Sequence, residues 1–191
     1  MLRNTVRLFA IVLAAFLLVG VESALAEKKF LDSEDAREKD EPQKFLPDYD
    51  KLVAGKDADW VYFPTGQGIK AFKTVTVNEF EENGRGRESR DAAHDGKDYT
   101  EQWLEREGFD IAKSGGELTI SGNICNAWEP QGAARYWGGW AANPGVCIEV
   151  IAKDAKGAVV AEVRQKAKGS TLRDAVENGL EDIVKSLAKG R

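Results

Sequence analysis

The stretch VCIEVIAKDAKGAVVAEVRQK, residues 146–166, decides the fold of this chain. Apolar and polar side chains alternate through its two halves, residues 146–153 and 158–166, and this period of two is typical of strands that bury one face. The residues between the halves, 154–157, read DAKG, which is a polar turn that ends in glycine. The sequence therefore predicts a half-buried antiparallel hairpin.

Further strands are predicted upstream of the hairpin. Residues 73–80, KTVTVNEF, are rich in β-branched side chains and predict the first main strand. Residues 118–126 alternate in the same way and predict a second strand. The aromatic run at residues 60–63 predicts a short strand or an extended packing segment that ends at Pro64.

A helix is predicted between these strands. Residues 81–98 are nearly all polar and predict a solvated loop. Asp98 is then placed to cap the N-terminus of a helix. At the other end, Gly108 fits the left-handed position after a helix, with Phe109 contacting Leu104 as in a Schellman motif.

The last helix follows from the pattern of residues 172–189. Thr171 precedes them as an N-cap, and apolar residues recur at helical spacing. The members of this stripe are Leu172, Val176, Leu180, Ile183, Val184 and Leu187. The sequence predicts an α+β domain with a small, mostly antiparallel sheet, two helices on one face, and the order β-α-β-β-β-α.

The N-terminus reads as a secretory signal peptide, residues 1–26. Arg3 and Arg7 precede an apolar run at residues 8–21, and small alanine side chains precede the expected cleavage between Ala26 and Glu27. An uncleaved anchor is the alternative, although a bilayer-spanning helix needs about 20 apolar residues. Export to the periplasm or the medium is therefore expected.

Charge and composition bound the partners. The chain has 191 residues, 42% of them hydrophobic, and a net charge of −5, which becomes −6 when residues 1–26 are removed. An acidic exported protein is a poor candidate for nucleic acid or anionic membranes. Residues 27–44 are charge-dense and predict a flexible tether, so residues 45–191 form one domain, and no membrane span is expected after cleavage.

Cys125 and Cys147 are the two cysteines of the chain. In an oxidising compartment a disulfide between them is expected. Strand alternation places both on the polar side of their strands, so the two sulfurs can share one side of the sheet. The alternative is a redox or metal pair, which neither a C-x-x-C spacing nor a nearby histidine supports.

The stretch FLPDY at residues 45–49, followed by the aromatic run and KTVTV, resembles the opening of an exported bacterial domain-of-unknown-function family, number 3313. Residues 122–157 resemble a second such family, number 4410. The resemblance implies an envelope location and an α+β fold, and it implies no activity. Many members of both families are lipoproteins, whereas this chain has no cysteine directly after the cleavage site to carry the lipid.

A segment rich in tryptophan and glycine is the strongest candidate for a binding site. It runs from Trp128 through RYWGGWAANP at residues 135–144. Flat rings with polar groups suit stacking on sugars, peptides or aromatic ligands, whereas the alternative is that these rings complete the core of a small domain. The candidate ligand-binding residues are Trp128, Arg135, Tyr136, Trp137 and Trp140.

The polar stretch before the first helix offers weaker candidates. His94 is the single histidine and is expected to be a solvated loop residue. Asp91 and Asp95 partly match a calcium loop that lacks two of its usual ligands. Arg85, Arg87 and Arg90 are interleaved with acidic residues, which indicates a solvated segment rather than an anion site. No catalytic residue, cofactor or metal site is assigned.

These observations favour a non-enzymatic, exported accessory or binding module of the cell envelope. Its expected partner is an envelope protein, bound through the Trp- and Gly-rich segment or an unpaired sheet edge. The alternative is a small-molecule or glycan binder that uses the same aromatic residues. A hydrolase stays open as a third class, because carboxylates are too numerous in this sequence to be paired by position.

Overall fold

The computed structural model describes residues 45–84, 87–129 and 143–190. The chain divides into two units, Met1–Glu41 and Pro42–Arg191, and all of the described residues belong to the second. The predicted signal peptide and tether, with the cleavage site between Ala26 and Glu27, lie outside the described residues.

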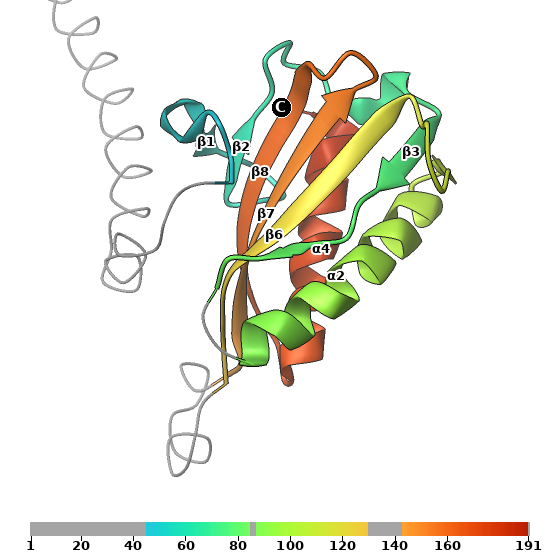
Figure 1. Ribbon diagram of the computed structural model, residues 1–191. Coiled ribbons are helices and arrows are strands. Elements are labelled where there is room, and N and C mark those ends of the chain that lie inside the picture. The colour runs from blue at the N-terminus through green and yellow to red at the C-terminus, as the bar shows by residue number, and fades with distance from the viewer. Residues whose placement is uncertain (1–44, 85–86, 130–142, 191) are drawn as a thin grey trace, which may run out of the picture. The chain divides into compact units, whose positions relative to one another are not determined.

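In the described part of the chain, eight strands form one mixed sheet (Figure 1). They run in the order β1-β2-β8-β7-β6-β3-β5, and β4 pairs with β6 off this path. The strands are β1 (Val53–Ala54), β2 (Trp60–Tyr62), β3 (Thr74–Val77), β4 (Glu81–Glu82), β5 (Asp110–Ile111), β6 (Leu118–Trp128), β7 (Gly145–Asp154) and β8 (Val159–Lys168).

The predicted hairpin is confirmed as β7 and β8, which pair in antiparallel fashion along their whole length. At its turn, the Asp154 N–H donates to the Ala158 carbonyl over 3.0 Å. Gly157 has a φ of 82°, in the left-handed region that glycine enters without a steric penalty. The other neighbour of β7 is β6, also antiparallel, so the three long strands form the centre of the sheet.

Two helices, α2 (Arg87–Arg106) and α4 (Leu172–Lys189), pack on the same face of the sheet (Figure 1). The predicted bounds of α4 are confirmed, and Thr171 Oγ1 accepts the Asp174 N–H over 3.1 Å as its N-cap. Each Leu, Ile or Val of its stripe contributes about 1.5–3 kcal/mol by burial. The members that are almost fully buried are Val176, Leu180, Ile183, Val184 and Leu187.

The predicted loop at residues 81–98 is wrong, because α2 already begins at Arg87 rather than after Asp98. Its first half packs against the sheet through small residues. A methyl group on Gly96 would lie 2.5 Å from Cδ2 of Phe80, so the helix can approach only because glycine is there. A pattern of large apolar residues does not reveal such a contact. The small buried residues are Ser89, Ala92, Ala93 and Gly96.

The end of α2 is as predicted. The Phe109 N–H donates to the Leu104 carbonyl over 3.0 Å, and the Gly108 N–H donates to the Glu105 carbonyl over 3.0 Å. Gly108 has a φ of 91°. These are the two hydrogen bonds of a Schellman motif, and they satisfy carbonyl groups that the last turn would otherwise leave unpaired.

The α+β class is confirmed, but the sheet is larger than predicted and mixed. β3 runs parallel to both β5 and β6, and β4 runs parallel to β6. The chain passes through α2 between β3 and β6, and such a crossover brings two strands together in parallel. The predicted order corresponds to β3, α2, β6, β7, β8 and α4, while β1, β4 and β5 are too short for alternation to be detected.

Candidate functional site

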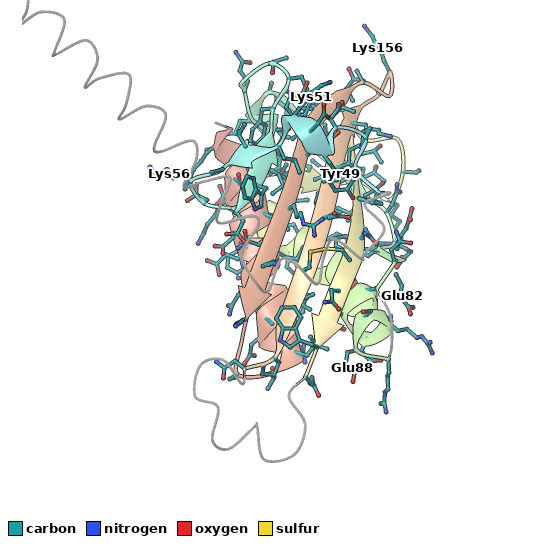
Figure 2. All side chains as sticks on the ribbon, turned by 90° about the vertical axis from the view of Figure 1, so that its left-hand side faces the viewer. Tyr49, Lys51, Lys56, Glu82, Glu88 and Lys156 are labelled. Atoms are coloured by element: carbon teal, nitrogen blue, oxygen red, sulfur yellow. A yellow bond between two sulfur atoms is a disulfide. The ribbon has the colours of Figure 1, made fainter. Side chains whose placement is uncertain are left out.

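The face of the sheet opposite the helices carries the polar side chains of the long strands, and we call it the polar face (Figure 2). Figure 2 views the sheet from this side, with Tyr49 in front of the strands. The segment at residues 45–52, which we call the strap, lies across this face through contacts with β7 and β8. The polar face includes Asn123, Cys147, Glu149, Glu162, Arg164, Lys166, Trp60 and Tyr62.

A buried ion pair lies at the centre of the polar face. Glu149 of β7 and Arg164 of β8 are register partners, and Arg164 Nη1 donates to Glu149 Oε1 over 2.6 Å. The side chains of Arg164 and Glu149 are only 3% and 2% exposed. A buried charge is tolerated only when its partner and hydrogen bonds compensate the lost hydration, so each member depends on the other.

Further donors complete the environment of Glu149. Asn123 Nδ2 donates to Oε2 over 2.9 Å, and the Tyr49 hydroxyl donates to Oε1 over 2.9 Å. Asn123 in turn accepts the Asn83 N–H over 3.2 Å, which ties the end of β4 to this cluster. Both oxygens of Glu149 therefore accept hydrogen bonds, from β6, β8 and the strap.

Tyr49 fixes the strap to the sheet. Its hydroxyl donates to Glu149 and accepts the N–H groups of Phe45 and Leu46, each over 3.3 Å. Burial and, next, the charge of Glu149 raise the pKa of Tyr49 to about 12. Tyr49 consequently stays a neutral hydrogen-bond donor throughout the physiological pH range.

Glu162 is the second carboxyl group beneath the strap. Its Oε2 accepts the Asp48 N–H over 3.2 Å, while its Oε1 is buried without a hydrogen-bond partner among the described residues. Burial raises the pKa of Glu162 to about 7. The hydrogen bond from the Asp48 N–H opposes the rise, the Asp48 carboxylate adds to it, and Lys51 and Lys153 also oppose it. A buried carboxyl group with one unpaired oxygen favours the neutral form.

The alternation in β7 and β8 predicts which face these residues occupy but not their burial. Glu149 is 1% and Glu162 0% exposed, although both stand on the polar side of their strands. The strap contacts both of them, and its Tyr49 is separated from Glu149 by 100 residues of sequence. The available signal was that Glu149, Glu162 and Arg164 occupy inner positions of two long alternating strands.

The predicted disulfide is confirmed. Cys125 and Cys147 are bonded, with their Cα atoms 5.3 Å apart. The register between β6 and β7 shifts between Ile124 and Asn126, so Cys125 is the extra residue of a β-bulge. The bond lies on the polar face as predicted, and it ties together the two strands from which the Trp- and Gly-rich segment extends.

Trp128 is the one predicted ligand-binding residue that the described part of the chain includes. It is half-buried at the end of β6, opposite Gly145 of β7. A methyl group on Gly145 would lie 2.0 Å from the Trp128 ring, so the ring lies directly on the glycine backbone. The other candidates, Arg135, Tyr136, Trp137 and Trp140, lie outside the described residues.

The weaker candidates lie on α2, and the expected loop environment for them is wrong. His94 is exposed, and Asp91 and Asp95 occupy one helical face instead of a calcium loop. Arg87 pairs with Asp91 over 3.3 Å, and Arg90 pairs with Glu82 over 3.5 Å, as in a solvated face of mixed charge. Among the described residues, no group of three metal-ligating side chains comes together.

No protein-family model matches the sequence, and no curated protein sequence matches it. Two solved structures share the fold, both described as PelC dodecamers from Paraburkholderia phytofirmans. One, of a PelC variant, is 20% identical, covers 69% of this chain and 97% of that chain, and has a TM-score of 0.52. The other is 18% identical over 69% of this chain and 98% of that chain, also with a TM-score of 0.52.

A weaker likeness is to a minor lipoprotein from Acinetobacter baumannii, which is 9% identical over 62% of this chain and 94% of that chain, with a TM-score of 0.33. No helix in residues 45–84, 87–129 and 143–190 is both long and apolar enough to cross a membrane. The similarity to PelC shows the fold alone, an α+β domain whose sheet is covered by helices on one face.

Proposed function

We propose that this protein is a non-enzymatic, exported binding module of the cell envelope, and that the polar face of the sheet is its binding surface. The observation that carries the proposal is the contrast between the two faces. The helices fill one face, whereas the other presents the half-buried rings of Trp60, Tyr62 and Trp128 around a buried ion pair. Rings with polar edges beside a rigid polar centre are typical of binding surfaces.

The envelope location is supported by two independent features. The sequence begins with a predicted signal peptide, residues 1–26. Cys125 and Cys147 form a disulfide, which persists in oxidising compartments such as the periplasm. Together these features support a periplasmic or secreted module.

A protein partner is the first expectation for the polar face. The PelC structures are dodecamers, so a second copy of this chain is one partner to be tested. A glycan is the alternative, favoured by Trp128, whose half-buried ring packs against Gly145 at the end of the sheet. A sugar ring stacks on such an aromatic platform, and the predicted residues Arg135, Tyr136, Trp137 and Trp140 would extend it.

The enzyme alternative would have to use the carboxyl groups of the polar face. Glu162 has a pKa near 7, which suits a general acid. In the closed structure, however, Glu162 is 0% exposed and Glu149 is occupied by three side-chain donors. Burial of both groups supports binding rather than catalysis as the function of this face.

A pair of matched aromatic variants tests the proposal on the purified exported protein. Tyr62→Ala alters the polar face, and Trp103→Ala alters the helix side of the sheet, where the half-buried ring packs against the core and lies 4.3 Å from the Arg106 guanidinium. Light scattering measures self-association and a glycan array measures sugar binding. We expect Tyr62→Ala to lose the interaction and Trp103→Ala to retain it. The reverse result would move the binding surface to the helices.

A further inference from the structure

We propose that the strap, residues 45–52, is a pH-dependent cover of the polar face, closed while Glu162 is protonated and released when Glu162 ionises. The strap covers the surface that we propose for binding, so this inference rests on the proposed function. Its mechanism is a local opening of the strap and can be measured without any ligand.

The strap contacts the polar face through the two buried carboxyl groups. Tyr49 donates its hydroxyl proton to Glu149, and the Asp48 N–H donates to Glu162 Oε2 over 3.2 Å. Only the first of these carboxyl groups is compensated by an arginine, because Arg164 Nη1 lies 2.6 Å from Glu149. The two contacts therefore differ in their response to pH: one anion is paired and the other carboxyl group is not.

Burial of Glu162 outweighs the groups that favour its negative charge, which are the Asp48 N–H, Lys51 and Lys153. Its Oε1 is buried and unpartnered, and no ion pair involves Glu162 in the described ranges 45–84, 87–129 and 143–190. The nearest lysine of the strap, Lys51, is already bound to Asp48 over 2.7 Å. The titratable and charged groups that face it are Asp48, Tyr49 and Lys51 from the strap, Glu149 and Lys153 from β7, Arg164 from β8 and Tyr62 from β2.

The direction of the response follows from proton linkage. Beneath the closed strap the pKa of Glu162 is about 7, whereas in an opened and hydrated site it returns to its ordinary value of 4.5. Opening is therefore coupled to loss of a proton between these two pH values. The equilibrium constant for opening rises about tenfold per pH unit between these two pH values and is constant well below and well above them. The total change between these two limits is about 300-fold.

The consequence for binding is a surface that is covered in acid and uncovered near neutrality. Release of the strap removes the Tyr49 hydroxyl from Glu149 and uncovers the side of Tyr62 over which Lys51 lies at 5.4 Å from the ring centroid. An acidic environment would thus hold the module in its covered form.

The test is amide hydrogen exchange by NMR on the exported protein, corrected for intrinsic rates, at pH values from 4.5 to 8. In the wild type, protection of the Asp48 amide should fall about 80-fold between pH 4.5 and 7, out of about 300-fold between the acidic and alkaline limits. Glu162→Gln keeps an acceptor but cannot ionise, so its protection should not change with pH. Glu105→Gln, on the exposed surface of α2, should behave as the wild type.

Two results would overturn the proposal. One is a wild-type Asp48 amide whose corrected protection is constant over this pH range, which requires no variant to fold. The other is an equal pH response in Glu162→Gln. Neither readout involves a binding partner, so failure of the strap mechanism is distinguishable from failure of the proposed function.

Discussion

Arg164 and Glu149 face each other on neighbouring strands of the sheet, with Nη1 and Oε1 2.6 Å apart and both side chains almost completely buried. The pair is oriented by its surroundings as well as by its own charges, because Asn123 and Tyr49 donate to the same carboxylate. This cluster links β6, β7, β8 and the strap. The contribution of each of these four side chains to the free energy of unfolding therefore depends on the presence of the other three.

Removal of Arg164 should be strongly destabilising. Arg164→Met leaves the Glu149 carboxylate buried without its cation, and we expect the free energy of unfolding to fall by about 3–5 kcal/mol. Urea denaturation at pH 7 measures the change. Replacing both residues, as Glu149→Gln with Arg164→Met, should lose less than Arg164→Met alone.

The matched control is Arg87→Met, which removes a solvent-exposed arginine from its pair with Asp91. Such exposed pairs contribute about 0–1 kcal/mol, so this variant should unfold close to the wild type. Equal losses from Arg87→Met and Arg164→Met would show that burial of the Glu149 pair has no energetic role.

The disulfide should contribute through the loop that it closes. Cys125 and Cys147 are separated by 22 residues, and the loop-entropy relation gives about 3 kcal/mol for a closure of this length. The double variant Cys125→Ala and Cys147→Ala should lose this amount in urea denaturation. Wild-type protein reduced with dithiothreitol should unfold at the same midpoint as the variant. Two free thiols in the unreduced wild type would contradict the bond.

Gly96 should be intolerant of the residue that a helix usually prefers. Alanine stabilises an exposed helix interior by about 1 kcal/mol relative to glycine, but on Gly96 its methyl group would lie 2.5 Å from the Phe80 ring. We therefore expect Gly96→Ala to lower thermal stability, with a cost of about 1–3 kcal/mol. His94→Ala, at an exposed position of α2, should not. An increase in stability for Gly96→Ala would show that Phe80 does not pack here as described.

Global stability should also depend on the protonation of Glu162. Because its pKa is raised from 4.5 to about 7, the folded state binds a proton that the unfolded state releases, so stability is lost as pH rises from 4.5 to 7. The loss is roughly 3 kcal/mol. Glu162→Gln should thus exceed the wild type in stability at pH 8 and lack this contribution to the pH dependence. Identical pH profiles would contradict the raised pKa.

The hairpin and α4 could be predicted because their signals are local and strong. Residues 154–157 form a turn between alternating strands, and the stripe from Leu172 to Leu187 buries one helical face. The Schellman motif at Gly108 is local as well. The start of α2 could not be predicted in this way, because Ala92, Ser89 and Gly96 are buried through close backbone approach rather than through large apolar side chains.

The centre of the polar face depends on contacts that are distant in sequence. Glu149 and Arg164 could be assigned to one face by alternation, but their burial depends on a fold that brings Tyr49 of the strap onto Glu149. The parallel pairing of β3 with β6 could not be predicted either, because the two strands are far apart in the sequence. The disulfide could be predicted because the two cysteines lie on the same side of their strands. No spacing motif in the sequence indicated that Glu149 and Glu162 would be buried.

The most direct test of the polar face as a binding surface is site-specific photo-cross-linking in growing cells. A photoreactive phenylalanine replaces Tyr62 on the polar face in one strain and Trp103 on α2 in another. We predict a discrete cross-linked product in the envelope fraction from position 62 and none from position 103. Cross-linking only from position 103, or recovery of the full-length, reduced protein from the cytosol, would contradict the proposal.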